Sequence, residues 1–332
     1  MATILGTLSE LITADTTAHI AKAIGVDESV VTRGVAVAGP TVLGSLAHTA
    51  QTTEGLASLM KMIPQETVAD SEAMLSNQLA DLSKNRASDD MMNAALGPGV
   101  NAIASTLSHT AGFNIRPVLA MFAPLVVGLM SKAAKTDKLD ANGLAEMLTR
   151  ESATFMADPA NTETANLVHS ALQAGNEAAA LRKTFDDVDW INVRMAPIAA
   201  LYLVGMASPS GASDEAHEIK AAAETVTDAV KNASPTSLLN TVFGHELTRN
   251  ELDILKKEAP PNEKTLGTIR DAVRAISIKD IAEAKSYSDL LMAVATNVAN
   301  AVTKGGFLGI GAKRVTDEEQ GALDAIATAI GH

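Results

Sequence analysis

The residues best suited to chemistry in this sequence are three acids and a histidine that gather at 214–218. They are Asp214, Glu215, His217 and Glu218. On a helix, Asp214 and Glu218 lie one turn apart and share a face with His217, which suits coordination of a hard divalent cation through oxygen ligands. Helix capping and solvation are the commoner uses of such residues, because carboxylates are stabilised near the positive end of a helix dipole. The spacing therefore indicates either a divalent-cation site or an acidic helix start.

A second acidic cluster begins the last predicted helix, after a glycine-rich loop. Thr316 is a predicted N-cap, and Glu319, three residues later, completes the pattern of a capping box. The apolar residues that follow share one helix face at spacings of three and four: Leu323, Ile326, Ala327 and Ile330. Glu319 is a third candidate metal ligand beside Asp214 and Glu218, although capping already accounts for it. Because calcium prefers about six to eight oxygens, we expect weak metal binding or none.

The glycine-rich loop contains Gly309 and Gly311, followed by Lys313 and Arg314. It lacks the third glycine of a dinucleotide loop and the Gly-Lys-Ser/Thr ending of a phosphate loop, and it follows a predicted helix instead of a strand. Lys313 and Arg314 are nevertheless placed to hold an anion at the start of the next helix, where backbone N–H groups point outward. Solvated charges on a tight connection are the alternative.

Several enzyme classes are excluded by their motifs. His245 and Glu246 begin like a zinc protease motif, but Arg249 stands where the second histidine is required. A di-iron bundle needs two Glu-x-x-His pairs, and the sequence has none. The absence of cysteine also excludes thiolate zinc sites, disulfides and cysteine nucleophiles.

Composition predicts an all-α protein of two helical domains. In 332 residues, hydrophobic residues make up 47% but aromatic residues only 3%, so Ala, Leu, Val, Ile and 13 Met must build the core. Such a core suits closely packed helices better than a β-sandwich, and no segment shows the alternation of a strand. The formal net charge of -13 opposes binding to a phosphate backbone, so we expect no nucleic-acid partner.

Two apolar runs, 117–130 and 195–207, invite comparison with membrane spans. Each is shorter than the roughly 18 residues that a span requires, and each contains a proline. We expect both to be buried helices, the second one beginning at the acidic triplet Asp186, Asp187 and Asp189. The N-terminus lacks the basic region of a signal peptide. No membrane span and a cytoplasmic location are therefore expected.

The N-terminal half contains an internal repeat. Pro40 and Gly44 lie four residues apart on an apolar helix, and Pro124 and Gly128 repeat that spacing. A Gly-Leu-Ala helix start follows each copy, at 55–57 and 143–145. We expect each proline near the first turn of its helix, where it costs no hydrogen bond, and each glycine at a close helix crossing. A ligand cleft between the apolar helices is the alternative.

The C-terminal half contains a weaker repeat, in which an apolar helix, a loop of small residues and an acidic helix start occur twice. Between the halves, Asp158 and Pro159 close an apolar region and precede a more polar, Ala-rich helix. We therefore predict domains at 1–157 and 185–332, joined by a bridging helix within 158–184.

Two family resemblances accompany these repeats. Residues 18–25, the segment around Pro40, residues 103–107 and residues 122–129 resemble the bacterial YidB-like domain of unknown function, over 1–157. That resemblance implies a helical fold without established chemistry. Residues 206–218 and 301–319 resemble the two half-repeats of the TerB-like family associated with tellurite resistance, over 185–332. This second resemblance implies a link to metal or envelope stress, although the aspartate of the family's loop is absent from both copies.

The sequence predicts a non-enzymatic helical module that binds a protein partner or assembles with copies of itself. The alternative is a small-molecule or metal-dependent enzyme that uses the acidic loops of the C-terminal domain, with a divalent cation as its only indicated cofactor. An enzyme would gather carboxylates in one concave pocket with shifted pKa values. A module would show dispersed carboxylates and exposed apolar surface.

Overall fold

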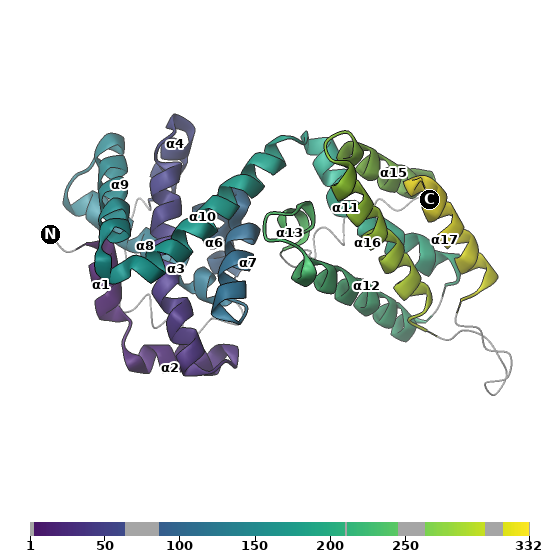
Figure 1. Ribbon diagram of the computed structural model, residues 1–332, viewed down its shortest axis with the longest axis horizontal. Helices are drawn as coiled ribbons and strands as arrows, with labels where there is room; N and C mark the ends of the chain where they lie inside the picture. Colours follow the sequence, from purple (N-terminus) through teal and green to yellow (C-terminus); the bar gives the residue numbers. More distant parts are fainter. Residues whose placement is uncertain (1–2, 64–85, 210, 245–262, 303–314, 332) are drawn as a thin grey trace. The chain divides into compact units, whose positions relative to one another are not determined.

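The computed structural model describes residues 3–63, 86–209, 211–244, 263–302 and 315–331 (Figure 1). Helices fill these ranges almost completely and no strand occurs in them, which confirms the predicted all-α fold. The chain forms two compact units, Met1–Ala179 and Ala180–His332. Each unit has its own hydrophobic core.

Unit 1 is built around two long apolar helices, α3 and α8. Its elements are α1 (Ile4–Leu11), α2 (Ala14–Ile24), α3 (Glu28–Thr49), α4 (Thr53–Met62), α6 (Arg86–Leu96), the 3-10 turn η1 (Gly97–Gly99), α7 (Val100–Ala111), α8 (Arg116–Thr136), α9 (Ala141–Ala157), the 3-10 turn η2 (Pro159–Asn161) and most of α10 (Thr162–Lys183). Helix α3 packs against α8 and also contacts α1, α2, α4, α6, α7 and α9. Fully buried residues such as Leu43 of α3 and Phe122 of α8 fill the core.

The repeated prolines lie in helix interiors. Pro40 is inside α3 and Pro124 is inside α8, so the predicted position near a first turn is wrong. Burial of these helices outweighs the roughly 3 kcal/mol that an interior proline costs an isolated helix. Gly44 of α3 is buried, and a Cβ atom there would lie 2.7 Å from Leu172 Cδ1 of α10, so the Leu172 side chain packs directly over this glycine. Gly128 is likewise buried within α8.

The Gly-Leu-Ala segments begin helices α4 and α9, as the repeat predicts. In α4, the N-cap Thr52 accepts a hydrogen bond on its hydroxyl from the Gly55 N–H at 3.1 Å. In α9, the N-cap Asp140 accepts on its carboxylate from the Gly143 N–H at 2.8 Å. A side-chain cap three residues before the glycine therefore starts the helix that follows α3 and the helix that follows α8.

Most of helix α10 belongs to unit 1. Val168 and Ala171 of α10 are buried in the unit 1 core. At Gly175 the α10 backbone meets Gly99 of η1, where a Cβ atom on Gly99 would lie 2.1 Å from the Gly175 carbonyl oxygen. The division between the units falls at 179/180, inside the segment predicted to bridge them and toward its C-terminal end.

Unit 2 is built around α11. After the end of α10, its described helices are α11 (Asp187–Ala207), α12 (Ala212–Asn232), α13 (Leu238–Phe243), α15 (Glu263–Ser277), α16 (Ile281–Ala299) and α17 (Asp317–Ile330). Helix α11 contacts α12, α13, α15, α16 and α17, with its longest packing along α15. Figure 1 shows these helices as a bundle in which the start of α11 and the connection between α15 and α16 lie at the same end.

A buried tyrosine compensates for the proline inside α11. Pro197 has no N–H, so the Val193 carbonyl four residues earlier lacks its usual helical donor. The Tyr287 hydroxyl of α16 donates a hydrogen bond to that carbonyl. Tyr287 is fully buried, its ring stacks with Phe243 at 6.3 Å, and burial raises its pKa well above the usual value. A side chain far away in sequence thus satisfies the helix at its proline.

Three described helices, α3, α8 and α11, are long and apolar enough to cross a membrane by length and composition alone. The apolar runs recognised in the sequence are shorter than α8 and α11, and α3 contains neither run. Within the most apolar 18-residue window, 72% of α3 and 83% of α8 is buried, but only 50% of α11. Burial in unit 1 accounts for the apolar character of α3 and α8, whereas half of the α11 window is only partly buried or exposed.

Candidate functional site

Two of the predicted site residues, Glu218 of α12 and Glu319 of α17, are the buried charged side chains of the described ranges. Glu218 is 4% exposed and Glu319 is 1% exposed. The two residues occupy different positions in their helices. Glu319 is the third residue of α17, whereas the third residue of α12 is Asp214 and Glu218 lies one helical turn after it. The acidic starts predicted from the sequence are therefore present in both helices.

The Glu319 carboxylate is engaged in the predicted capping box. It accepts a hydrogen bond from the Thr316 N–H at 2.8 Å, and the Glu319 N–H donates to the Thr316 hydroxyl at 3.2 Å. Three of the four residues predicted for the apolar face, Leu323, Ile326 and Ile330, are buried, and Ala327 is half-buried. Capping accounts for the burial of Glu319 without a bound ion.

Glu218 packs against a glycine of the central helix. A Cβ atom on Gly205 of α11 would lie 2.9 Å from Glu218 Oε2, so the absence of a side chain at Gly205 makes room for the carboxylate. Asp214 is partly exposed, and the exposed His217 pairs its Nδ1 with the Ser213 carbonyl oxygen at 2.8 Å. Glu218 therefore turns inward while its acidic neighbours remain at the surface.

Within the described residues, no three His, Asp or Glu side chains lie close enough together to hold a metal ion. Asp214, Glu218 and Glu319 are all among the described residues, and the structure does not bring these three side chains into one cluster. The divalent-cation site stays a prediction from the sequence. Lys313 and Arg314, the predicted anion-binding pair, lie outside the described residues.

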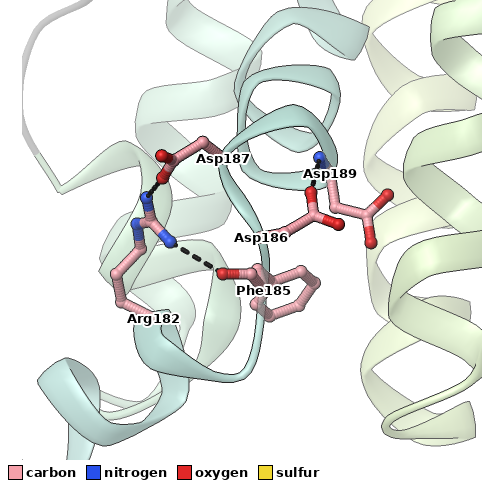
Figure 2. Close-up of polar contacts among 5 residues, drawn as sticks. All are labelled: Arg182, Phe185, Asp186, Asp187 and Asp189. Atoms are coloured by element: carbon pink, nitrogen blue, oxygen red, sulfur yellow. Dashed lines mark hydrogen bonds and ion pairs between the residues drawn. The ribbon is translucent and has the colours of Figure 1, made fainter.

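The third acidic segment forms the start of α11 (Figure 2). Asp186 is the N-cap and accepts a hydrogen bond from the Asp189 N–H at 2.8 Å, as expected for a helix start. Arg182, at the end of α10, donates to Asp187 Oδ1 at 2.7 Å and to the Phe185 carbonyl oxygen at 3.0 Å. The Asp189 carboxylate points away from Arg182. One arginine thus fixes the turn between α10 and α11.

Aromatic and cationic side chains connect this turn to the rest of unit 2. The Arg182 guanidinium lies 4.8 Å from the centre of the Trp190 ring, and Trp190 packs against Phe185 at 5.6 Å. The Lys279 ammonium lies 4.6 Å from the centre of the Phe185 ring. Lys279 stands in the short connection between α15 and α16, so this connection lies beside the start of α11.

Four exposed branched side chains surround this junction, and the sequence-based prediction missed them. Val188 is 69% exposed, Ile191 58%, Ile278 77% and Ile281 80%. We call these four residues the apolar patch. The sequence offered one signal of the patch, since Ile278 and Ile281 flank the polar pair Lys279-Asp280. That signal was not enough to predict the patch, because the sequence does not show whether an apolar residue is buried or exposed.

The fold and these surfaces define an all-α protein of two units whose second unit has exposed apolar side chains. Residues 6–133, within unit 1, match a family described as a bacterial protein of unknown function, DUF937. The match agrees with the resemblance noted for the N-terminal half and ends before α9. No curated protein and no solved structure matches the chain.

Proposed function

We propose that the protein is a non-enzymatic helical module that binds another protein through unit 2. The observation that carries the proposal is the distribution of exposed large apolar side chains. In unit 1 the described exposed member is Met60, whereas unit 2 has the four residues of the apolar patch and Met206. Exposed apolar residues that lie together mark interaction sites, because their hydration is unfavourable unless a partner covers them.

The polar groups of unit 2 support the same proposal. The Asp186 and Glu319 carboxylates cap helices, and Asp187 pairs with Arg182. Asp186, Asp187 and Glu319 thus serve local structure. Asp214 and Glu215 of α12 lie at the surface, whereas Glu218 is buried beside Gly205. This is the dispersed arrangement expected of a binding module.

The finer family and cellular assignments are part of this proposal. The first unit is proposed to be YidB-like and the second TerB-like, with a cytoplasmic location and a link to metal or envelope stress. Support for the second assignment is the repeated order of a long apolar helix followed by an acidic helix start, in α11 with α12 and in α16 with α17. Any divalent cation would then bind at Asp214, Glu218 or Glu319.

Quantitative pull-down from a lysate of the native host tests the proposed function. The bait is the full chain, compared with a Val188→Ser, Ile191→Ser variant and with Met206→Ser as a control on the same helix. We expect at least one protein to be depleted from the double variant and retained by the control, and to bind the purified full chain directly. A protein set that is identical for all three baits would overturn binding through unit 2.

A further inference from the structure

The apolar patch is formed by two segments that the fold brings together. Val188 and Ile191 lie one turn apart on the exposed side of α11, and Ile278 and Ile281 flank the connection between α15 and α16. Lys279 of that connection reaches the Phe185 ring, three residues before Val188. Helix α11 also packs along α15. The two segments that carry the four branched side chains therefore lie at the same end of unit 2, where Figure 1 shows the start of α11 beside the connection between α15 and α16.

The charges in the two segments that carry the patch are mainly negative, and of the cations about one turn outside them, Arg274 and Lys285 are paired with Asp271 and Asp289. Segments 182–191 and 278–283 contain five carboxylates and three cations: Asp186, Asp187, Asp189, Asp280 and Glu283, against Arg182, Lys183 and Lys279. Two of the three cations are engaged inside the junction, since Arg182 pairs with Asp187 and Lys279 lies over a ring. Among the described residues, Asp186 and Asp280 accept hydrogen bonds from backbone N–H groups at helix starts. Their charges remain available to a partner.

The negative charge around the patch favours some binding partners over others. The formal net charge of -13 makes a second copy of the chain and an anionic membrane repulsive at long range. A segment with apolar residues on one face and lysine or arginine beside them matches both the patch and its acidic rim. A helix is the fitting form, because the patch is about one helical turn wide along α11 and presents short branched side chains between which larger ones can insert.

We propose that the apolar patch binds a basic amphipathic helix of a partner protein. The inference rests on the proposed function and specifies the chemistry of the partner. Val188, Ile191, Ile278 and Ile281 supply the apolar contact, and Asp186, Asp189 and Asp280 attract the cations that border the partner's apolar face.

The test measures binding of a synthetic peptide to the full chain. The probe is a fluorescent helix of about 18 residues, five turns, made of leucine and lysine with helical periodicity. A matched peptide has glutamate in place of every lysine. Fluorescence anisotropy is recorded at about 0.15 M salt, where long-range attraction by the total charge is largely screened. We expect saturable binding of the lysine peptide and none of the glutamate peptide.

Variants assign the binding to the patch. Val188→Ser with Ile191→Ser, and separately Ile278→Ser with Ile281→Ser, should each weaken binding of the lysine peptide at least tenfold. Because these side chains are exposed, the variants should retain the parent's helical circular dichroism and melting temperature. Met206→Ser, an exposed control outside the patch, should bind like the parent.

Two double variants that each remove two negative charges test the acidic rim, which is formed by Asp186, Asp189 and Asp280. Asp189→Asn with Asp280→Asn should weaken binding several-fold, and asparagine retains the capping role at 280. Glu10→Gln with Glu163→Gln removes two exposed charges from unit 1 and should leave binding unchanged. Equal losses in the two pairs would show attraction by total charge alone and would overturn the proposal.

The outcomes separate this inference from the proposed function. Lysine-peptide binding that the serine variants do not weaken overturns the inference. So does binding of the glutamate peptide, or patch-dependent dimerisation or vesicle binding without peptide binding. If the pull-down nevertheless finds a patch-dependent protein, the proposed function holds and only the partner's chemistry is wrong. If neither experiment depends on the patch, both proposals fail.

Discussion

Replacing Tyr287 with phenylalanine isolates the hydrogen bond that the proline inside α11 makes necessary. The substitution keeps the ring and its stacking on Phe243, and it removes the hydroxyl that donates to the Val193 carbonyl. That carbonyl is then buried without a donor, because Pro197 has no N–H to offer. A buried unsatisfied carbonyl costs about 1–3 kcal/mol. For a unit of this size, the melting temperature should fall by about 2–4 °C per kcal/mol.

A double-mutant cycle with Pro197→Ala tests the cause of that loss. Alanine at 197 restores the N–H that can reach the Val193 carbonyl within the helix. Tyr287→Phe should then cost less than about 1 kcal/mol, which gives a coupling free energy of about 1–2 kcal/mol between the two positions. The matched control is Tyr202→Phe at the other tyrosine, which should change stability by no more than about 0.5 kcal/mol.

The assay is urea unfolding followed by the fluorescence of Trp190, the single tryptophan of the chain, which reports on unit 2. Burial raises the pKa of Tyr287, so the native state retains the phenolic proton at a pH where the unfolded state loses it. The unfolding free energy of the parent should therefore fall as pH rises beyond about 10, and Tyr287→Phe should reduce that fall. A neutral Tyr287→Phe, or additive effects in the cycle, would refute the role assigned to the hydroxyl.

Three further substitutions test unit 1. Gly99→Ala should destabilise the protein by about 1–3 kcal/mol, because its Cβ would lie 2.1 Å from the Gly175 carbonyl oxygen, whereas Gly267→Ala, with open space around it, should not destabilise in the same thermal melts. The Thr41 hydroxyl is buried without a hydrogen-bond partner among the described residues, so Thr41→Val should raise the unfolding free energy by about 1–2 kcal/mol in urea titrations. A lower unfolding free energy in the variant would show that the hydroxyl has a hydrogen-bond partner. The Glu151 carboxylate accepts a hydrogen bond from the first N–H of α1, and burial raises the pKa of this carboxyl although the hydrogen bonds oppose the shift. The unfolding free energy of the parent should therefore fall, relative to that of Glu151→Gln, as pH rises from about 4 to 7. Parallel pH profiles of the two proteins would contradict this.

Features that depend on neighbouring residues were predictable from the sequence. The capping box of Thr316 and Glu319, the N-cap at Asp186 and the glycine-led starts of α4 and α9 are satisfied by partners within three residues. The predominance of small and aliphatic residues likewise indicated helices, because aromatic residues are too few for a typical β core. Short-range hydrogen bonding and side-chain periodicity suffice for such features.

Features that depend on distant partners were not predictable. The interior position of Pro197 is compensated by Tyr287, which lies 94 residues from Val193. The placement of α10 depends on Gly99 meeting Gly175, and neither glycine is unusual in its own segment. The apolar patch requires the turn around Lys279 to meet Phe185. Each of these contacts is created by the fold, so local rules give no indication of it.

The position of α9 and α10 has a consequence for how far the N-terminal domain extends. The family match ends at residue 133, yet Leu144 and Leu148 of α9 and Val168 of α10 are buried in the same core as the matched residues. Gly44, inside the match, receives Leu172, which is outside it. A chain cut after α8 would leave one flank of α3 open to water. The segment that must be present for the unit 1 core to close is therefore longer than the segment that matches the family. A stable fragment of this protein should end near Ala179.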